Sequence, residues 1–146
     1  MTIYFVESSA SEQRELLCRW AEKFSASGER VQVVVGSTQG AQFIDQLMWT
    51  FSQSGFIPHS ILGGEQPDLL ESVIIVIGEK HIDGFRTVIC DMQAGLDFMM
   101  GFETAVHFIL RDDEERRQES RQLWRKAKDA GLNVVHVPYG RPPEPV

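Results

Sequence analysis

Short, almost unbroken runs of β-branched residues alternate with longer segments of helical periodicity, and this alternation limits the possible folds most. The clearest runs are Val31–Val35 and Val73–Ile77. Strands this apolar are typical of a sheet covered on both faces, because an exposed face would place polar residues at alternate positions. When strands and helices alternate, consecutive strands lie parallel and the helices cross over between them. The sequence therefore predicts an α/β sandwich with a largely parallel central sheet.

Further elements complete this alternation. Strands are expected at residues 3–6, 87–90, 104–110 and 133–137. A first helix should begin after Ser9, which forms a possible capping box with Glu12, and should stop at Gly28. Residues 95–101 offer a short helix or a packed loop. An irregular segment is expected at residues 56–59, followed by the Gly-containing residues 62–65.

A second helix is expected after the loop at residues 36–38, with its apolar residues along one side. That side is formed by Phe43, Ile44, Leu47, Met48 and Phe51. At about 100° of rotation per residue, Trp49 projects almost opposite the centre of this stripe. A large aromatic residue there is either covered by Phe56 and Pro58 folding back or exposed as an anchor for a partner, and the sequence favours neither.

The helix expected at residues 114–131 carries a basic and aromatic patch in a chain whose formal net charge is -7. The patch consists of Arg117, Arg121, Trp124, Arg125 and Lys128. Helical spacing places Leu123, Ala127 and Ala130 in the sector that faces the core, so the cations point away from it. Guanidinium groups around a large ring suit a ligand with one carboxylate and one apolar group, such as the end of an acidic peptide.

A simpler interpretation of this helix stays open. The acidic residues 112–115 in the first turn and the cations later complement the helix dipole, and long cations usually cover a solvated helix side. Trp124 is equally compatible with packing at the edge of a neighbouring strand. The helix alone does not decide between a binding site and a charged surface.

Size and composition fit one domain. The chain has 146 residues, of which 42% are hydrophobic, and it shows neither an internal repeat nor a long linker. We expect a single domain over residues 1–138 and a flexible, Pro-rich tail over residues 139–146. The longest apolar run is far below the roughly 20 residues that cross a bilayer, and no basic segment precedes the first one, so neither membrane insertion nor export is expected.

Charge and cysteine content narrow the function. A sequence pI near 5.0 argues against a general polyanion binder, because nonspecific affinity for nucleic acid depends on a surplus of cations. Contact with DNA is therefore expected to be indirect. Cys18 and Cys90 have no metal-type spacing, which predicts two buried thiols in a reducing cytoplasm.

Motifs for catalysis, metal binding or a cofactor are missing from the sequence. The loop from Gly36 to Gly40 lacks the lysine and the spacing of a P-loop, and Ser37 or Thr38 is explained as a helix N-cap. Asp91 follows a strand but has no motif-level partner, so a turn residue is expected. The scattered histidines show no HExxH pattern, and no serine lies in a GxSxG elbow.

Several segments together resemble the chi subunit family of the bacterial DNA polymerase III holoenzyme. They are Cys18, the turn at residues 28–31, residues 47–49, residues 54–59, and residues 121–125 running into residues 130–131. Their order is more specific than any one of them, and the resemblance extends from the first strand to Val137. It implies a noncatalytic, single-domain, Rossmann-like three-layer sandwich that bridges the clamp loader to single-stranded DNA-binding protein.

The resemblance also assigns roles to residues. Arg121, Trp124 and Arg125 match the family's pocket for the acidic, phenylalanine-ended tail of single-stranded DNA-binding protein, with Trp124 replacing the usual tyrosine. Trp49 and Phe56 match apolar positions that face the small psi subunit, which connects chi to the clamp loader. In a host without psi, these two residues would contact another subunit or serve packing.

Two other functions stay open at this point. One is a small enzyme or sensor that binds a nucleotide or phosphorylated metabolite with the Gly36 to Gly40 loop and Asp91. The other is a protein that docks only on the polymerase assembly, with the basic helix serving solubility. A nucleotide that stabilises the chain when the tail peptide does not would favour the first.

Overall fold

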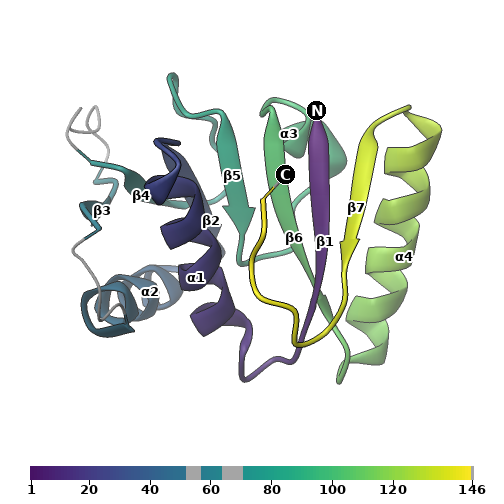
Figure 1. Ribbon diagram of the computed structural model, residues 1–146, viewed down its shortest axis with the longest axis horizontal. Helices are drawn as coiled ribbons and strands as arrows, with labels where there is room; N and C mark the ends of the chain where they lie inside the picture. Colours follow the sequence, from purple (N-terminus) through teal and green to yellow (C-terminus); the bar gives the residue numbers. More distant parts are fainter. Residues whose placement is uncertain (52–56, 64–70, 146) are drawn as a thin grey trace.

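The computed structural model describes residues 1–51, 57–63 and 71–145, and its core is one seven-stranded sheet (Figure 1). The strands are β1 (Thr2–Ser8), β2 (Val31–Val35), β3 (His59–Ile61), β4 (Val73–Ile77), β5 (Thr87–Cys90), β6 (Thr104–Leu110) and β7 (Asn133–Val137). Their order across the sheet is β3-β4-β2-β5-β6-β1-β7. Each neighbouring pair is parallel, which confirms and strengthens the prediction of a largely parallel sheet.

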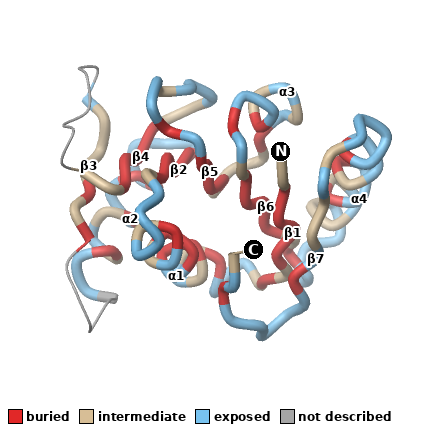
Figure 2. The backbone as a smooth tube through the Cα atoms, turned by 45° about the horizontal axis from the view of Figure 1, so that its top comes forward, coloured by how far each residue is buried: buried red, intermediate tan, exposed pale blue. Residues whose placement is uncertain are grey.

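Helices cover both faces of this sheet and complete a three-layer α/β sandwich. They are α1 (Gln13–Ala26), α2 (Thr38–Phe51), α3 (Leu96–Met99) and α4 (Glu114–Asp129). Figures 1 and 2 show α1 and α2 on one face and α3 and α4 on the other, with buried residues concentrated along the strands. Side chains alternate along β1, so Tyr4 packs with the α1 cluster and Phe5 with the α4 cluster.

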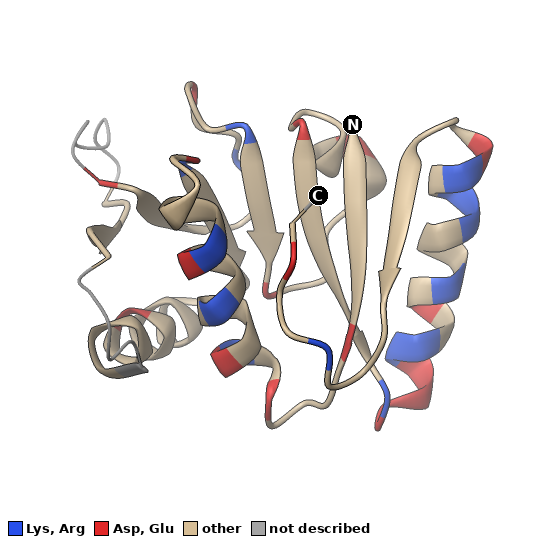
Figure 3. Ribbon diagram, viewed as in Figure 1, with Lys and Arg blue, Asp and Glu red and all other residues tan. Residues whose placement is uncertain are grey.

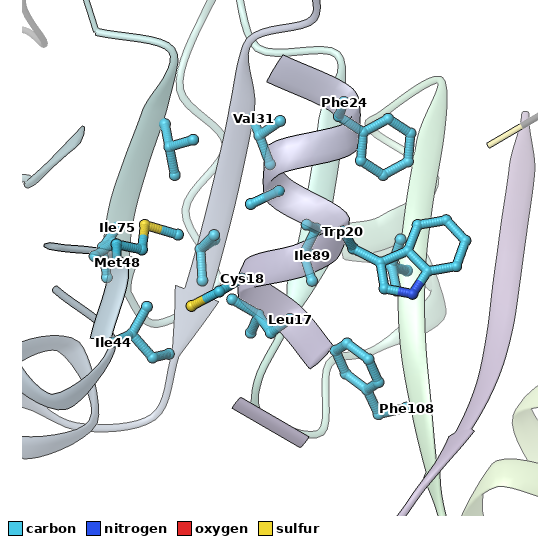
Figure 4. Packing of buried hydrophobic residues seen from close by; sticks show 14 of the residues in the cluster. Leu17, Cys18, Trp20, Phe24, Val31, Ile44, Met48, Ile75, Ile89 and Phe108 are labelled. Carbon is cyan, nitrogen blue, oxygen red and sulfur yellow. The ribbon is translucent and has the colours of Figure 1, made fainter. Parts of the chain in front are cut away.

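The cluster under α1 shows why the first helix forms where it does. Leu17, Cys18 and Trp20 are fully buried against the sheet, and Figure 4 shows Cys18 on the side of α1 that faces Ile44 and Trp20 on the opposite side. The helix ends before Gly28, whose φ of 85° is the left-handed conformation that glycine adopts without strain. Both cysteines are buried and free, and burial raises the pKa of the Cys18 and Cys90 thiols to about 12, as expected for inert structural thiols.

Three local predictions were wrong. The capping box fails because α1 begins at Gln13 and Glu12 is its N-cap; the Ser9 hydroxyl instead donates to the Glu12 carboxylate at 3.1 Å. Phe43 does not join the α2 stripe: its side chain is 54% exposed, and the Arg14 guanidinium lies 5.1 Å from its ring centroid. The segment expected to be irregular overlaps the start of β3, a strand that was missed because three residues give no periodicity to detect.

The C-terminal tail passes back over the α1 face of the sheet (Figure 1). Pro143 is buried, and the Tyr139 hydroxyl donates to Glu12 at the start of α1. The domain boundary at residue 138 and the flexibility expected of the tail stay predictions. Among the described residues, no helix is long and apolar enough to span a membrane.

Candidate functional site

Helix α4 is fixed at both ends and along its buried side. The Asp113 carboxylate caps its first turn by accepting the Arg116 N–H at 3.1 Å, and Gly131 follows its end at a φ of 77°. Leu123 and Ala127 face the sheet as predicted. Ala130 was predicted to join them and does not, because the helix ends one residue earlier and leaves Ala130 exposed.

The outer side of α4 carries a line of cations (Figure 3), and four residues of the predicted patch meet at one pocket. This pocket, here called the arginine-tryptophan pocket, has a volume of about 400 Å³. It is lined by Arg117, Arg121, Trp124, Arg125, Ser120, Phe5, Glu7, Ile109 and His136. Lys128 lies beside it, with its ammonium 5.6 Å from the centroid of the Trp124 ring.

The arginines of this pocket differ in how far internal acids neutralise them. Arg117 makes an ion pair with Glu114 at 3.3 Å, one turn earlier on the same helix. Arg121 and Arg125 are exposed, and neither has an ion pair within the part of the chain that the structure describes. Their guanidinium donors are therefore accessible to a carboxylate from another molecule.

Trp124 packs against a neighbouring strand and also lines the pocket. The side chain is half-buried, and its ring packs edge to face against Phe5 of β1, with centroids 5.0 Å apart and planes at 73°. The rest of the ring lines the arginine-tryptophan pocket. A ring held by Phe5 offers a preorganised apolar surface, so an apolar side chain can pack against it without first ordering the indole.

The opposite wall of the pocket was not predicted. It consists of Phe5 and Glu7 from β1, Ile109 from β6 and His136 from β7. Glu7 Oε2 lies 3.1 Å from His136 Nε2, so the carboxylate that lines the pocket already has a partner on the next strand. The alternation of side chains along β1 gives the signal: Phe5 and Glu7 share a face, but which helix covers that face appears only in the fold.

Beneath the pocket lies a buried hydrogen bond between β6 and α4. His107 Nε2 is 2.8 Å from the Ser120 hydroxyl, and both side chains are buried. Burial, and after it the charge of Arg116, lowers the pKa of His107 to about 4. The imidazole is therefore neutral at pH 7, which agrees with the structural role expected of the scattered histidines.

The second predicted surface lies at the far end of the sheet. Trp49 on α2 is 54% exposed, and its ring centroid is 4.7 Å from that of His59 in β3. His59 is buried, with Nδ1 at 2.7 Å from the Ile57 carbonyl oxygen. Phe56, the other residue assigned to this surface, lies outside the described residues. Because β3 and β7 are opposite edges of the sheet, Trp49 and the arginine-tryptophan pocket are separate sites.

Two features that could bind a phosphate make hydrogen bonds within the protein instead. They are the loop from Gly36 to Gly40 and the residue Asp91. The Ser37 hydroxyl accepts the Gly40 N–H at 3.0 Å, which is the N-cap role predicted for Ser37 or Thr38. The Asp91 carboxylate accepts from Arg14 at 3.2 Å and from the Gln13 amide at 3.0 Å. These bonds explain both features without a bound phosphate.

Comparisons with known proteins agree on one family. The model of the DNA polymerase III chi subunit, HolC, matches residues 1–135. DNA polymerase III subunit chi of Escherichia coli (strain K12) is 28% identical over 127 residues, which cover 86% of this chain and 84% of that protein. The same subunit of Haemophilus influenzae (strain ATCC 51907 / DSM 11121 / KW20 / Rd) is 25% identical over 123 residues, 82% of this chain and 83% of that protein.

A solved structure supports the fold alone. The crystal structure of T4 UvsW superposes with a TM-score of 0.62 at 10% sequence identity. The match covers 93% of this chain but only 40% of that longer chain. Fold and sequence together lead to one assignment: the chain belongs to the DNA polymerase III chi subunit family, and with it to the accessory proteins of DNA replication.

Proposed function

We propose that this protein is a noncatalytic adaptor that binds the acidic C-terminal tail of single-stranded DNA-binding protein and links it to the clamp loader of DNA polymerase III. The observation that carries the proposal is the arginine-tryptophan pocket, where Arg121 and Arg125 have no ion pair with any residue that the structure describes. Family membership supplies the replication context. Contact with DNA is indirect in this proposal, through the protein that binds the single strand.

The pocket can bind both the carboxylate and the aromatic ring of the terminal residue of the peptide. The terminal carboxylate of the peptide pairs with Arg121 or Arg125, whose planar guanidinium accommodates two carboxylate oxygens. The terminal ring packs against Trp124, which Phe5 already holds in place. One apolar anchor and a few charge pairs give a dissociation constant in the micromolar range, about 8 kcal/mol, that weakens as salt screens the charges.

Titration of a labelled acidic peptide ending in phenylalanine tests this proposal. Arg121→Ala should reduce the binding free energy by about 2 kcal/mol, or roughly thirtyfold, because it removes a charge-assisted hydrogen bond. Lys126→Ala is the matched control, since Lys126 is exposed on the same helix and does not line the pocket. Equal binding by the wild type and Arg121→Ala would remove Arg121 from the site.

Trp49 supplies the surface that we propose for the clamp loader side, where psi or another subunit docks. Its 54% exposed ring is held beside His59, and aromatic rings of this kind are common anchors at protein interfaces. Trp49→Ala should weaken assembly with the clamp loader and leave tail-peptide binding unchanged. Loss of both activities would show that the two surfaces are not independent.

The nucleotide-binding alternative is distinguished by a thermal-shift screen. Asp91 and Ser37 already make the internal bonds described above, so we expect no stabilisation by nucleotides. A nucleotide that raises the melting temperature when the tail peptide does not would instead favour that alternative.

A further inference from the structure

A second pocket adjoins the arginine-tryptophan pocket. It has a volume of about 450 Å³ and is lined by Glu7, Ser9, Arg111, Asp112, Arg117 and Tyr139. Glu7 and Arg117 line both pockets. The two pockets therefore share walls and are here together called the groove; their lining comes from α4 and from the carboxyl ends of β1, β6 and β7.

Arg111, one of the two arginines that line this second pocket, lies over an aromatic ring. The Arg111 guanidinium lies 4.3 Å from the centroid of the Tyr139 ring. Stacking of this kind covers the face of a guanidinium and leaves the N–H donors in its plane directed outward. Both residues are exposed, and Arg111 has no ion pair in the described ranges 1–51, 57–63 and 71–145.

The carboxylates of the groove are hydrogen-bonded to other groups of the protein. Glu7 accepts the Tyr139 N–H at 3.2 Å and contacts His136 at 3.1 Å. Asp112 accepts the Ala10 N–H at 3.1 Å. These contacts occupy oxygens of the two carboxylates, whereas among the described residues Arg111 has no carboxylate paired with it.

One residue of this pocket, Tyr139, lies beyond the family match. The match ends at residue 135, and Tyr139, which holds Arg111, follows it. The Tyr139 hydroxyl is in turn bonded to Glu12, so the start of α1 fixes the ring. The pocket is therefore completed by a segment of this chain outside the part that matches the family.

We propose that Arg111, held by Tyr139, forms a second subsite of the groove, which binds the acidic side chains that precede the terminal residue of the bound peptide. This inference rests on the proposed function, because it assigns the upstream part of the same ligand. The terminal residue occupies the arginine-tryptophan pocket, and the chain then passes Arg117 toward Arg111. Side chains of Asp and Glu are the chemistry that this subsite recognises, through charge-assisted hydrogen bonds.

Two synthetic peptides test the subsite. Both end in phenylalanine, and they differ only in whether the preceding residues are Asp or Asn. Arg111→Gln should weaken binding of the Asp peptide by about threefold, the effect typical of an exposed charge pair, and leave binding of the Asn peptide unchanged. Lys126→Gln makes the same charge change outside both pockets and should alter neither.

Variants at Tyr139 separate the ring from its hydroxyl. Tyr139→Phe keeps the ring under Arg111 and should preserve the preference for the Asp peptide. Tyr139→Ala removes the ring. Its preference for the Asp peptide over the Asn peptide should fall to about the preference that Arg111→Gln shows. If Arg111→Gln weakened the binding of both peptides equally, Arg111 would have a structural role and the proposed subsite would be wrong.

The remaining outcomes distinguish this inference from the proposed function. If Arg121→Ala weakens both peptides but Arg111→Gln weakens neither, only the subsite is wrong. If the wild type binds neither peptide, both proposals are wrong. If a single-stranded oligonucleotide competes with the Asp peptide only when Arg111 is present, the subsite binds phosphates, and the assignment to acidic side chains fails.

Discussion

Among the pockets in which an arginine lies beside an aromatic ring, two differ clearly in what neutralises the arginine. One, here called the Arg14 pocket, has a volume of about 290 Å³ and contains Phe43. There Arg14 pairs with Asp91 at 3.2 Å and lies over the Phe43 ring. In the arginine-tryptophan pocket, Arg121 and Arg125 have no such partner in the described chain.

This difference distinguishes a structural arginine, which neutralises a buried acid of the protein, from an available arginine, which can pair with a ligand. The Asp91 side chain is 6% exposed, so it needs Arg14 as a counter-charge, and the pair links α1 to the end of β5. Arg121 and Arg125 are exposed on α4, and within residues 1–51, 57–63 and 71–145 no acid pairs with them. An arginine in a pocket is therefore evidence for binding only after its internal partners are known.

Replacing both available arginines tests whether they serve peptide binding rather than stability. Arg121→Ala combined with Arg125→Ala should weaken tail-peptide binding by about 3 kcal/mol, on the order of a hundredfold, because the terminal carboxylate loses its charged donors. The free energy of unfolding should change by less than about 0.5 kcal/mol, as for most exposed substitutions. Fluorescence titration and urea denaturation measure the two quantities, and a large loss of stability would contradict the distinction.

Acid should destabilise the α4 side through His107. The folded pKa of about 4 lies below the ordinary value of 6.5, so the unfolded chain binds the proton more readily. Stability from this group is complete above pH 6.5 and is lost as the pH falls from 6.5 to 4, by on the order of 3 kcal/mol. Urea denaturation at pH 7 and pH 4.5 measures the loss.

His107→Gln is the control for this effect. Glutamine cannot titrate and can still hydrogen-bond to Ser120, so the variant should be less stable than the wild type at pH 7 but less sensitive to acid. The carboxylates titrate equally in both proteins, and the difference between the two pH profiles isolates His107. Identical profiles would show that the buried imidazole does not control acid stability.

Removing the structural arginine should affect the stability of the protein but not its binding of the peptide. Arg14→Ala should lower the free energy of unfolding by about 2 kcal/mol, because Asp91 keeps a buried charge without its counter-ion. Peptide binding should be unchanged. Arg19→Ala is the matched control on α1, since its pair with Glu15 is exposed on both sides and should contribute less than about 0.5 kcal/mol. Equal effects of the two substitutions would contradict a special role for the Arg14 pair.

The smallest expected effect concerns Lys128. Its ammonium lies 5.6 Å from the Trp124 ring centroid and does not line the pocket. Lys128→Gln should weaken peptide binding by about 0.5 kcal/mol or less, as an exposed charge at the rim. A loss as large as that of Arg121→Ala would move the peptide path toward the C-terminal end of α4 and away from Arg111.

Periodicity alone predicted most of the fold because burial acts on every strand of a covered sheet. The runs at β2 and β4 have no polar alternation, and a strand buried on both faces needs none. One error falls where a single contact overrides the pattern. Phe43 has the helical spacing of a core residue, but Arg14 from α1 covers its ring instead of the sheet.

The sequence grouped the α4 residues of the candidate pocket but not the residues of its opposite wall, for a related reason. Arg117, Arg121, Trp124 and Arg125 lie within nine residues of one helix, so helical geometry brings them together. Their counterparts in the opposite wall come from three strands that are distant in sequence. Only the sheet order, with β1 between β6 and β7, places those strands side by side.

The sequence by itself determined the layers of the sandwich and the cationic side of α4, because both follow from repeats of hydrophobicity and charge over a few neighbouring residues. The tertiary structure decided which arginines remain available, since ion pairs such as Arg14 with Asp91 join residues far apart in the chain. It also decided that Tyr139 lies under Arg111, a contact between the ends of two strands that β1 separates. Local patterns repeat along a chain, whereas the pairing of single charges depends on the fold.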